Sequence, residues 1–315
     1  MRVLITGVTG FTGSHLAEYA QAAGAEVFGV SLDENFPPGV TGHRCDITHP
    51  GVVETLVADV RPDRVFHLAA IVPGSVAQVA PDRLFTVNVL GTWRVLEAVQ
   101  RRAPTACTLV VSSAAVYGPV PPERQPIAED APFNPVTAYA ASKAMQDLLA
   151  GQYATGHGLR VMRARTFNQI GPREHPGLIG ATIARQVAEI EAGLCVPEIS
   201  LRYLFTRRDF TDVRDVVRAY WLILERGTPG AAYNVCSGKP HSIGDVLHRL
   251  LAIAGLSGVQ IVEREHQLLP GDVALSLGNP TRLVADTGWQ PVIPLEQSLR
   301  DLLDEWRSRL KGEIS

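Results

Sequence analysis

Hydrophobic residues in the first half of the chain fall into short apolar runs, and helical patterns stand between them. The runs lack a clean alternation with polar positions, which is typical of strands buried on both faces of a parallel sheet. The predicted strands cover residues 2–6, 26–30, 63–70, 107–113 and 159–166, and the predicted helices cover residues 14–24, 50–60, 84–102 and 138–156. This order predicts an α/β fold of the Rossmann type, a doubly wound parallel sheet with helices on both faces.

The alternation loosens after residue 166. Residues 168–177 read as a loop, 181–193 as a helix, and 208–227 as a segment that turns into another helix. A further strand is predicted at 231–238, and the tail 294–310 is an amphipathic helix. These elements predict a smaller C-terminal α/β lobe at the carboxyl ends of the strands, where open α/β sheets bind ligands.

We therefore expect two domains. A Rossmann domain that binds NAD(P) covers residues 1–167, and residues 211–236 return to it. A lobe that binds the substrate covers residues 168–210 and 237–315.

Composition narrows the class of protein. The 315 residues are 46% hydrophobic and carry a net charge of −3, which gives no case for a nucleic acid or a membrane as partner. The four cysteines lack metal-ligand spacing, so we expect reduced thiols and no metal. Neither a signal peptide nor an apolar run of about 18 residues is found, and the sequence predicts a soluble cytoplasmic protein.

A glycine-rich turn follows the first strand. Gly7, Gly10 and Gly13 stand between that strand and a helix, where tight turning and a free helix N-terminus suit a pyrophosphate. Three glycines can also form an ordinary turn, but their placement favours a dinucleotide.

The end of the second strand bears on the choice of dinucleotide. Ser31 stands there, with Asp33 two residues beyond, and a serine can donate to a 2′-phosphate. NADP(H) is slightly favoured, although Leu32 offers no guanidinium and NAD(H) stays open. Asp46 is a candidate for the adenine amino group, and a simple turn aspartate is the alternative.

Tyr139 and Lys143 are four residues apart and share one face of a predicted helix. A phenol has a pKa near 10, and an ammonium fixed beside it favours the phenolate. Ser113 stands at a strand end from which it can reach the same substrate carbonyl. A solvated helix face is the alternative explanation of the pair.

Together these motifs resemble the extended short-chain dehydrogenases/reductases that act on nucleotide sugars. The resemblance rests on "GVTGFTG", "FHLAA", "VNVLGT", "SSAAVYG", "YAASK", "RTFNQIGP", "RDFTDVRDVVRAY", "YNVCSG" and "TGWQPVIPLEQSL". It implies a catalytic triad of Ser113, Tyr139 and Lys143, with Tyr139 as the acid/base. The implied cofactor contacts are Gly7, Thr9, Gly10, Phe11, Thr12, Gly13, Ser31, Asp46, Ile47, Leu68, Ala69, Ala70, Tyr139 and Lys143. The implied substrate contacts are Ser113, Asn168, Arg208 and, more weakly, Arg185; an ordinary surface arginine is the alternative for Arg208.

Within that family, the sugar 4,6-dehydratases carry acidic residues after the catalytic Ser/Thr, and here Ala114 and Ala115 stand in those places. Dehydration is therefore disfavoured, because a methyl group cannot move a proton. The phrases are most similar to the GDP-4-keto-6-deoxy-mannose reductases, which form GDP-rhamnose with NADPH. A nucleotide-sugar 4-epimerase with retained NAD and a non-catalytic nucleotide-binding protein are the alternatives.

Three changes on the substrate side depart from the family pattern. Arg202 and Tyr203 replace a Gly-Asn pair, Leu269 replaces an arginine, and Pro73 replaces a serine. We hypothesise that Arg202 supplies the missing guanidinium.

The resemblance also implies a homodimer that pairs two helices of each copy. Val95, Leu96, Met145 and Leu149 are candidates for that face, and burial inside one subunit explains them equally well.

Overall fold

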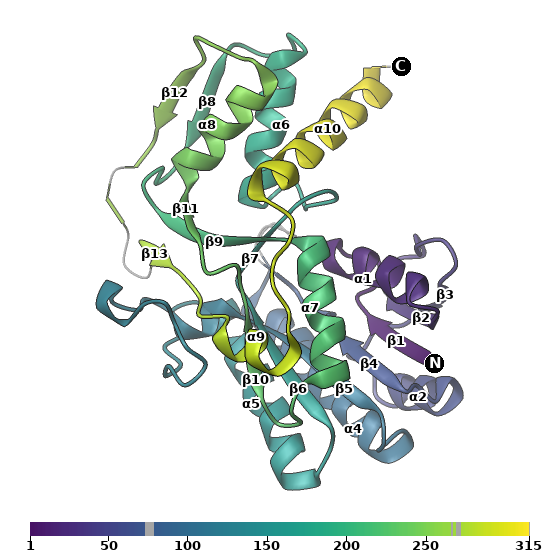
Figure 1. Ribbon diagram of the computed structural model, residues 1–315. Helices are drawn as coiled ribbons and strands as arrows, with labels where there is room; N and C mark the ends of the chain where they lie inside the picture. Colours follow the sequence, from purple (N-terminus) through teal and green to yellow (C-terminus); the bar gives the residue numbers. More distant parts are fainter. Residues whose placement is uncertain (73–78, 266, 269–271, 315) are drawn as a thin grey trace.

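A computed structural model describes residues 1–72, 79–265, 267, 268 and 272–314. It contains a seven-stranded parallel sheet in the order β10-β6-β5-β4-β1-β2-β3 (Figure 1). The strands are β1 (Arg2–Thr6), β2 (Glu26–Ser31), β3 (Thr41–Arg44), β4 (Arg64–His67), β5 (Cys107–Ser113), β6 (Val161–Thr166) and β10 (Ala232–Val235). The predicted α/β fold of the Rossmann type is confirmed.

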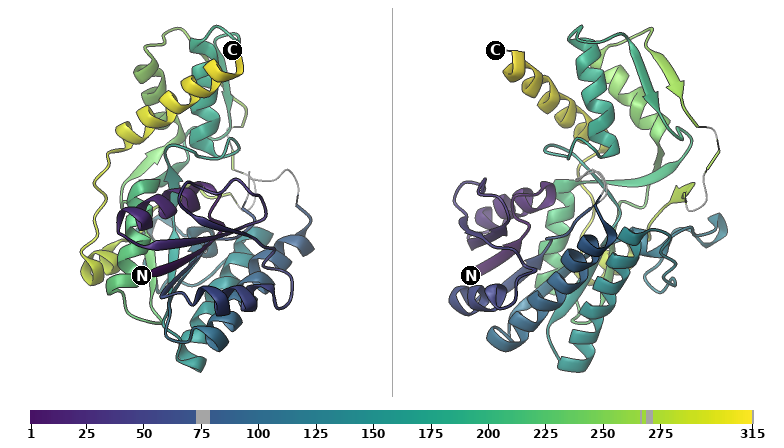
Figure 2. Two further views of the ribbon diagram at one scale, coloured as in Figure 1. Left: turned by 90° about the vertical axis from the view of Figure 1, so that its right-hand side faces the viewer. Right: turned by 180° about the vertical axis from the view of Figure 1, so that it is seen from behind.

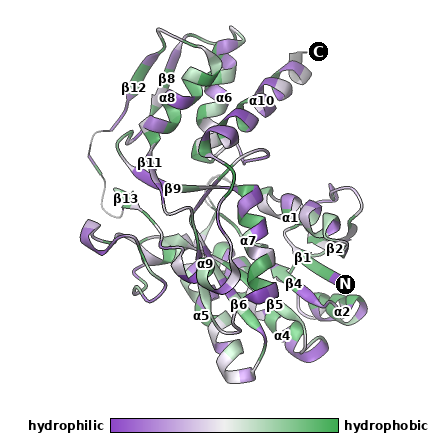
Figure 3. Cartoon of the chain, viewed as in Figure 1, coloured by the Kyte–Doolittle hydropathy of each residue, from purple (hydrophilic) through white to green (hydrophobic). Residues whose placement is uncertain are grey.

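Helices cover both faces of this sheet, as the unbroken apolar strands predict. Val3 and Ile5 of β1 face one core and Leu4 faces the other, because successive side chains of a strand point to opposite sides. The first core includes α1 (Phe11–Ala22) and α7 (Val213–Arg226), and the second includes α2 (Val52–Val60), α4 (Thr92–Arg102) and α5 (Ala138–His157). Figure 3 shows β1 as hydrophobic along most of its length.

The helix predicted over 84–102 is interrupted. The chain forms α3 (Pro81–Phe85), then the π-helical η1 (Thr86–Gly91), and only then α4. Asn88 in η1 binds both backbone groups of Ile71, accepting from its N–H at 2.7 Å and donating to its C=O at 3.0 Å. Asn88 also donates to the Ser142 hydroxyl at 3.0 Å. These tertiary bonds accompany the wider helical turn, a feature that hydrophobic periodicity does not reveal.

A second lobe stands above the carboxyl ends of the sheet in the orientation of Figure 1. Its core joins three helices, and Leu247, Leu299 and Trp306 are among the buried residues. The elements of this lobe are α6 (Ile179–Glu191), α8 (Ile243–Ala254), α10 (Leu295–Ile314), β8 (Glu198–Leu201) and β12 (Gln260–Glu263). The N-terminus lies at the sheet and the C-terminus at the end of α10 in the second lobe (Figure 2).

Short strands connect the two lobes. β9 (Arg207–Asp212) pairs with β7 (Asn168–Ile170), β11 (Pro240–Ser242) and β13 (Leu275–Ser276). Part of the predicted loop 168–177 is therefore a strand.

The cores differ from the expected domain boundaries at one place. Leu283 of α9 (Thr281–Thr287) and Trp289 pack in the first core, although the sequence prediction placed all of 237–315 in the substrate lobe. Among the described residues, no helix is long and apolar enough to cross a bilayer.

Candidate active site

The glycine-rich turn forms a tight cradle between β1 and α1. Gly7 has a left-handed φ of +72°, and a Cβ placed there would lie 2.9 Å from the backbone nitrogen of Ala69. A Cβ on Gly13 would lie 2.1 Å from the carbonyl oxygen of Gly7. Gly10 is the N-cap residue of α1, and no side chain of the described residues caps this helix start. The cradle fits the pyrophosphate of a dinucleotide, which binds the free N–H groups of a helix N-terminus.

The end of β2 approaches this turn. The hydroxyls of Thr9 and Ser31 are 2.6 Å apart, and Thr9 also lies 3.2 Å from a carboxylate oxygen of Asp33. Thr12 in the first turn of α1 donates to Gln169 at 2.8 Å, which ties the turn to β7. The structure thus brings the predicted ribose residues to the same edge of the sheet.

The remaining predicted cofactor residues surround this edge. The carboxylate of Asp46 accepts from the backbone N–H and the hydroxyl of Thr48 at 2.8 and 2.7 Å, so it forms a local turn. Ile47 is buried, and a Cβ on Gly91 would touch its side chain. Leu68, Ala69 and Ala70 follow β4 and are half-buried, with the Ala69 N–H donating to the Thr6 hydroxyl at 3.1 Å.

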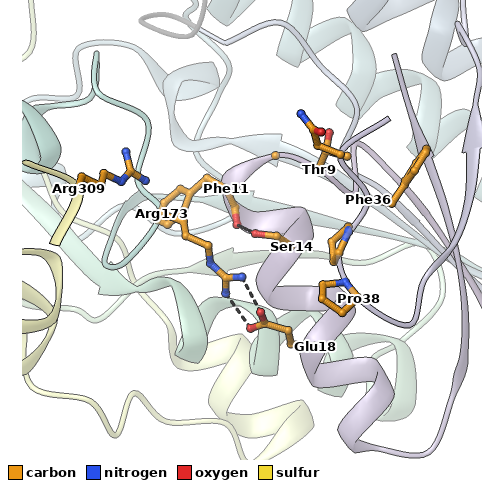
Figure 4. A pocket seen from close by; sticks show the side chains of 11 residues that line it. Thr9, Phe11, Ser14, Glu18, Phe36, Pro38, Arg173 and Arg309 are labelled. Atoms are coloured by element: carbon orange, nitrogen blue, oxygen red, sulfur yellow. Dashed lines mark hydrogen bonds and ion pairs between the residues drawn. The ribbon is translucent and has the colours of Figure 1, made fainter. Parts of the chain in front are cut away.

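A cavity of about 430 Å³ opens beside the start of α1 (Figure 4). Thr9, Phe11 and Ser14 line it from the turn and α1, and Phe36 and Pro38 line it from the loop after β2. Two arginines, Arg173 and Arg309, approach from the second lobe. Arg173 holds Glu18 of α1 through two bonds of 2.6 and 2.7 Å, so this contact joins the two lobes beside the cavity.

Ser113 and Tyr139 meet at the carboxyl end of the sheet. Ser113 is the last residue of β5, and Tyr139 lies in the first turn of α5, which Thr137 caps by accepting from the Ala140 N–H. The Ser113 side chain lies close enough to the Tyr139 hydroxyl to act on its pKa. Burial raises the pKa of Tyr139, and Ser113 offsets part of that shift. At neutral pH the phenol is therefore protonated.

Lys143 lies one turn further along α5 and is 3% exposed. Its ammonium donates to the backbone carbonyl of Val111 and to the side-chain oxygen of Gln146, both at 2.5 Å. Burial lowers the pKa of Lys143 to about 7, although the charge of Asp147 opposes this shift. The sequence led us to expect a lowered phenol pKa beside the ammonium, and burial of the phenol gives the opposite direction.

On the substrate side, the structure brings two of the four predicted contacts, Asn168 and Arg208, to adjacent strands. Asn168 on β7 pairs with Phe210 on β9, and Arg208 stands two residues earlier on β9. Arg208 is half-buried, and burial lowers its pKa. Arg185 is exposed on α6 and pairs with Glu189 on the same helix at 3.3 Å.

Two of the positions that depart from the family pattern, Arg202 and Tyr203, lie within the described residues. Arg202 binds the carboxylate of Glu265, whose second oxygen accepts from the Tyr203 hydroxyl at 2.6 Å. Part of the Arg202 guanidinium is therefore already engaged by Glu265. Leu269 and Pro73 lie outside the described residues.

Two alanines follow Ser113 as the sequence indicated, and one polar residue beside Lys143 was not predicted. Ala114 and Ala115 follow Ser113 in η2 (Ala114–Tyr117), so methyl groups stand where dehydratases carry acids. Gln146 was not predicted, although it follows Lys143 by three residues, a spacing that places two side chains on one helix face. Among the described residues, no cluster of three His, Cys, Asp or Glu side chains could hold a metal.

A strand–glycine turn–helix unit beside a Ser, Tyr and Lys set defines a short-chain dehydrogenase/reductase of the extended type. Residues 4–302 match the family model of GDP-mannose 4,6 dehydratase, and the chain belongs to this family.

Individual relatives agree with the family. The chain is 35% identical to the GDP-6-deoxy-D-mannose reductase of Pseudomonas aeruginosa over 99% of both chains. It is similar to the structure of RMD from Pseudomonas aeruginosa complexed with NADPH, with a TM-score of 0.85, 34% identity and coverage of 98% and 99% of the two chains. The UDP-glucose 4-epimerase of Thermus thermophilus with NAD gives a TM-score of 0.86, 31% identity and coverage of 98% and 99%.

These matches confirm the predicted resemblance and the predicted class, an NAD(P)-dependent enzyme of the extended short-chain dehydrogenase/reductase type. The alternative of a non-catalytic nucleotide-binding protein is not supported.

Proposed function

We propose that this enzyme reduces the keto group of a 4-keto-6-deoxy nucleotide sugar, GDP-4-keto-6-deoxy-mannose, and forms GDP-rhamnose. The observation that carries the proposal is the proximity of Ser113, at the end of β5, to the half-buried Tyr139 at the start of α5, with Lys143 one turn further on. The name of the most similar reductase, 35% identical along the whole chain, supports this substrate.

Each residue of the site has a separate role in the reaction. A dinucleotide bound with its pyrophosphate at the glycine-rich turn would supply, from its nicotinamide, the hydride that the carbonyl carbon receives. Ser113 donates a hydrogen bond to the carbonyl oxygen, and Tyr139 gives that oxygen its proton. The phenol of Tyr139, whose pKa burial raises, is protonated at neutral pH and so has a proton to give. The Lys143 ammonium then stabilises the phenolate that remains.

The cofactor favoured by this arrangement is NADP(H), with NAD(H) as the alternative. Ser31 and Thr9 offer two hydroxyls at the ribose edge, and the similar reductase structure holds NADPH. The similar epimerase structure holds NAD, so the choice depends on how Asp33 affects a 2′-phosphate.

For the diphosphate of the substrate we propose Asn168 and Arg208 as contacts. They come from neighbouring strands between the two lobes, and the half-buried guanidinium of Arg208 is an anion partner in a partly desolvated place. Arg185 fits less well, because it is exposed and paired with Glu189.

A nucleotide-sugar 4-epimerase is the second candidate, since the triad is common to both enzymes and epimerases are among the similar proteins. The UDP-glucose 4-epimerase of Mycolicibacterium smegmatis is 30% identical over 98% of this chain. An epimerase regenerates its cofactor in every cycle, whereas a reductase consumes it.

The test follows from that difference. Purified protein is incubated with NADPH and GDP-4-keto-6-deoxy-mannose, and we expect one NADPH oxidised for each GDP-6-deoxyhexose formed. Co-purified NAD, with UDP-glucose converted to UDP-galactose and no NADPH consumed, would establish the epimerase instead. The same assay on GDP-mannose should give no 4-keto product, because Ala114 and Ala115 cannot carry the eliminated proton.

We also propose a homodimer in the cytoplasm. Val95 and Leu96, two of the predicted interface residues, are buried in the core of the subunit. The exposed large apolar side chains of η1, α4 and α5 are Leu90, Trp93, Met145 and Leu148, and the half-buried Val89 and Leu149 line a shallow hollow with Met145 and Leu148. A patch of large apolar side chains suits a second copy of the chain. The cytoplasmic location rests on the four free cysteine thiols, three of which are buried.

A further inference from the structure

A continuous chain of buried polar side chains runs behind Lys143. It passes from Lys143 to Gln146 on α5, to Thr92 at the start of α4, to His67 at the end of β4, and to Thr6 at the end of β1. The four links measure 2.5, 2.8, 2.8 and 2.8 Å, and each residue is at most 3% exposed. In Figure 1 these elements lie side by side in the sheet and the layer beneath it.

The chemistry of Thr92 fixes the direction of the bonds. Its hydroxyl has a single proton, which it donates to the backbone carbonyl of Asn88 at 2.6 Å. The oxygen of Thr92 must therefore accept from both Gln146 and His67. This turns the amide nitrogen of Gln146 to Thr92 and leaves its carbonyl oxygen for Lys143.

The same argument sets the tautomer of His67. Its Nε2 carries the proton donated to Thr92, so its Nδ1 accepts from the hydroxyl of Thr6. Thr6 in turn accepts from the N–H of Ala69, the residue that packs against Gly7 of the glycine-rich turn. The chain of bonds therefore connects the catalytic lysine with the backbone that forms the cofactor cradle.

The titratable groups around Lys143 are neutral or have their charge compensated, which leaves Gln146 as a side-chain acceptor for the lysine ammonium. Burial lowers the pKa of His67 to about 3, so this ring is neutral and adds no charge from β4. Asp147 on α5 is held by Arg165 and Arg163 of β6, which compensate its charge. Tyr139 on the same helix is protonated, and β5 presents the carbonyl of Val111. Two neutral oxygens, those of Val111 and Gln146, thus receive two of the three ammonium protons.

We propose that Gln146 is a positioning residue. Its side-chain oxygen, which Thr92 and His67 orient toward Lys143, keeps the lysine ammonium charged and leaves its third N–H free to face the catalytic pocket. The proposal rests on the proposed function, because it assigns Gln146 a part in the proton transfer of Tyr139. A buried ammonium that loses one of two acceptors gives up its proton more easily. The phenolate would then lose its electrostatic partner at a lower pH.

Lysine NMR tests the proposal without any substrate. The chain has three lysines, Lys143, Lys239 and Lys311, so protein labelled with ¹³C at lysine Cε gives three signals. Disappearance of one signal in Lys143→Met assigns it. We expect Lys143 to titrate about one pH unit lower in Gln146→Leu and about one unit higher in Gln146→Glu, because the first removes an acceptor and the second adds a negative charge.

Kinetics give the second readout. The alkaline limb of the kcat/KM profile with NADPH and the keto sugar should move in the same two directions. In Gln146→Leu kcat should fall about 10- to 100-fold while KM for the sugar changes little, since the loss concerns the transition state. Gln100→Leu on α4 removes a half-buried amide that binds His157 and should change neither readout.

The outcomes separate the two proposals. An unshifted Lys143 titration in a folded Gln146→Leu protein, or shifts of the same sign in both variants, would overturn the role of Gln146. Opposite shifts in the NMR titration without turnover of any keto sugar by the wild type would support the positioning role and refute the reductase. Thermal unfolding of each variant shows whether it is folded, and Gln146→Glu keeps the size of the side chain.

Discussion

The hydroxyl of Ser113 lies close enough to the phenol of Tyr139 to lower its pKa, although one ends a strand and the other lies in the first turn of a helix. This contact places the proton donor where a carbonyl oxygen can also reach the serine. It depends on the parallel sheet, whose strands all deliver their carboxyl ends to one edge.

Replacement of the phenol tests its part in the reaction. Tyr139→Phe should lower kcat by about 10²- to 10⁴-fold, because the general acid is lost while the ring keeps its packing. NADPH binding, followed by fluorescence, should stay within a few-fold of the wild type. Tyr153→Phe removes another phenol from the same helix, one that binds Glu97, and should retain activity. A Tyr139→Phe protein with wild-type kcat would contradict the assignment.

The cofactor preference can be tested at the end of β2. Ser31→Asp places a carboxylate beside Thr9, where it should repel a 2′-phosphate and accept from a 2′-hydroxyl. We expect the Kd for NADPH to rise by about 10-fold or more and the Kd for NADH to fall or stay unchanged. Titration of intrinsic fluorescence with both nucleotides gives the ratio. A change of equal size for both would place the 2′-phosphate elsewhere.

Glu174 should make stability depend on pH. Burial raises the pKa of this carboxyl to about 8, from an ordinary value of 4.5, although backbone N–H groups at the start of α6 oppose the shift. Between these two values the unfolded chain loses a proton that the folded protein keeps, so the free energy of unfolding falls as pH rises.

Glu174→Gln removes that titration. Relative to the wild type, the free energy of unfolding of the variant should increase by about 2–4 kcal/mol between pH 5 and pH 8. Urea unfolding at pH 5 and pH 8 measures this increase. Any free-energy cost of the new amide that is the same at both pH values cancels when the two are compared. Glu189→Gln, on the same helix, should run parallel to the wild type. If the free energy of unfolding of Glu174→Gln changed with pH as that of the wild type does, Glu174 would be ionised in the folded protein.

The buried carboxylate of Asp147 should contribute more to the free energy of unfolding than an exposed carboxylate does. It is fully buried and accepts from Arg165 at 2.9 and 3.0 Å and from Arg163 at 3.1 Å. Asp147→Ala should cost about 3–5 kcal/mol, because it leaves a buried guanidinium unpaired. Asp304→Ala, which removes an exposed partner of Arg307, should cost about 0–1 kcal/mol. Chemical denaturation of the two variants side by side gives the comparison.

The apolar face on α5 predicts the oligomeric state. Leu148 is 61% exposed and Met145 is 48% exposed, which is unusual for such side chains. Leu148→Lys should convert a dimer to a monomer, as seen by light scattering during gel filtration. Leu194→Lys changes an equally apolar, exposed position in the other lobe and should leave the dimer intact. A monomeric wild type would refute the interface.

Much of the fold was predictable because its signals are local. The strand at 2–6, the strand at 107–113 and the helix that begins at Ala138 appear where the sequence placed them, since each is marked by its own hydrophobic run or by a cap such as Thr137. The break of the helix at Asn88 was not predictable. It depends on bonds to Ile71 and Ser142, and nothing in the neighbouring residues indicates those partners.

The candidate site shows the same division. The glycines and the Tyr139/Lys143 spacing indicated a dinucleotide and a proton donor, because a turn and a helix face are defined by adjacent residues. The local turn made by Asp46, the ion pair of Arg202 and the buried position of Val95 and Leu96 became visible only in the folded chain.

By itself the sequence determined the order of strands and helices, the cradle of glycines and the set of reactive side chains. The tertiary structure alone decided the electrostatic state of that set. Whether a phenol keeps its proton or an ammonium its charge depends on burial and on partners such as Thr92 and His67, which arrive from distant parts of the chain. Ionisation responds to everything within a few ångströms in space, whereas the pattern of residues records only what is near along the chain.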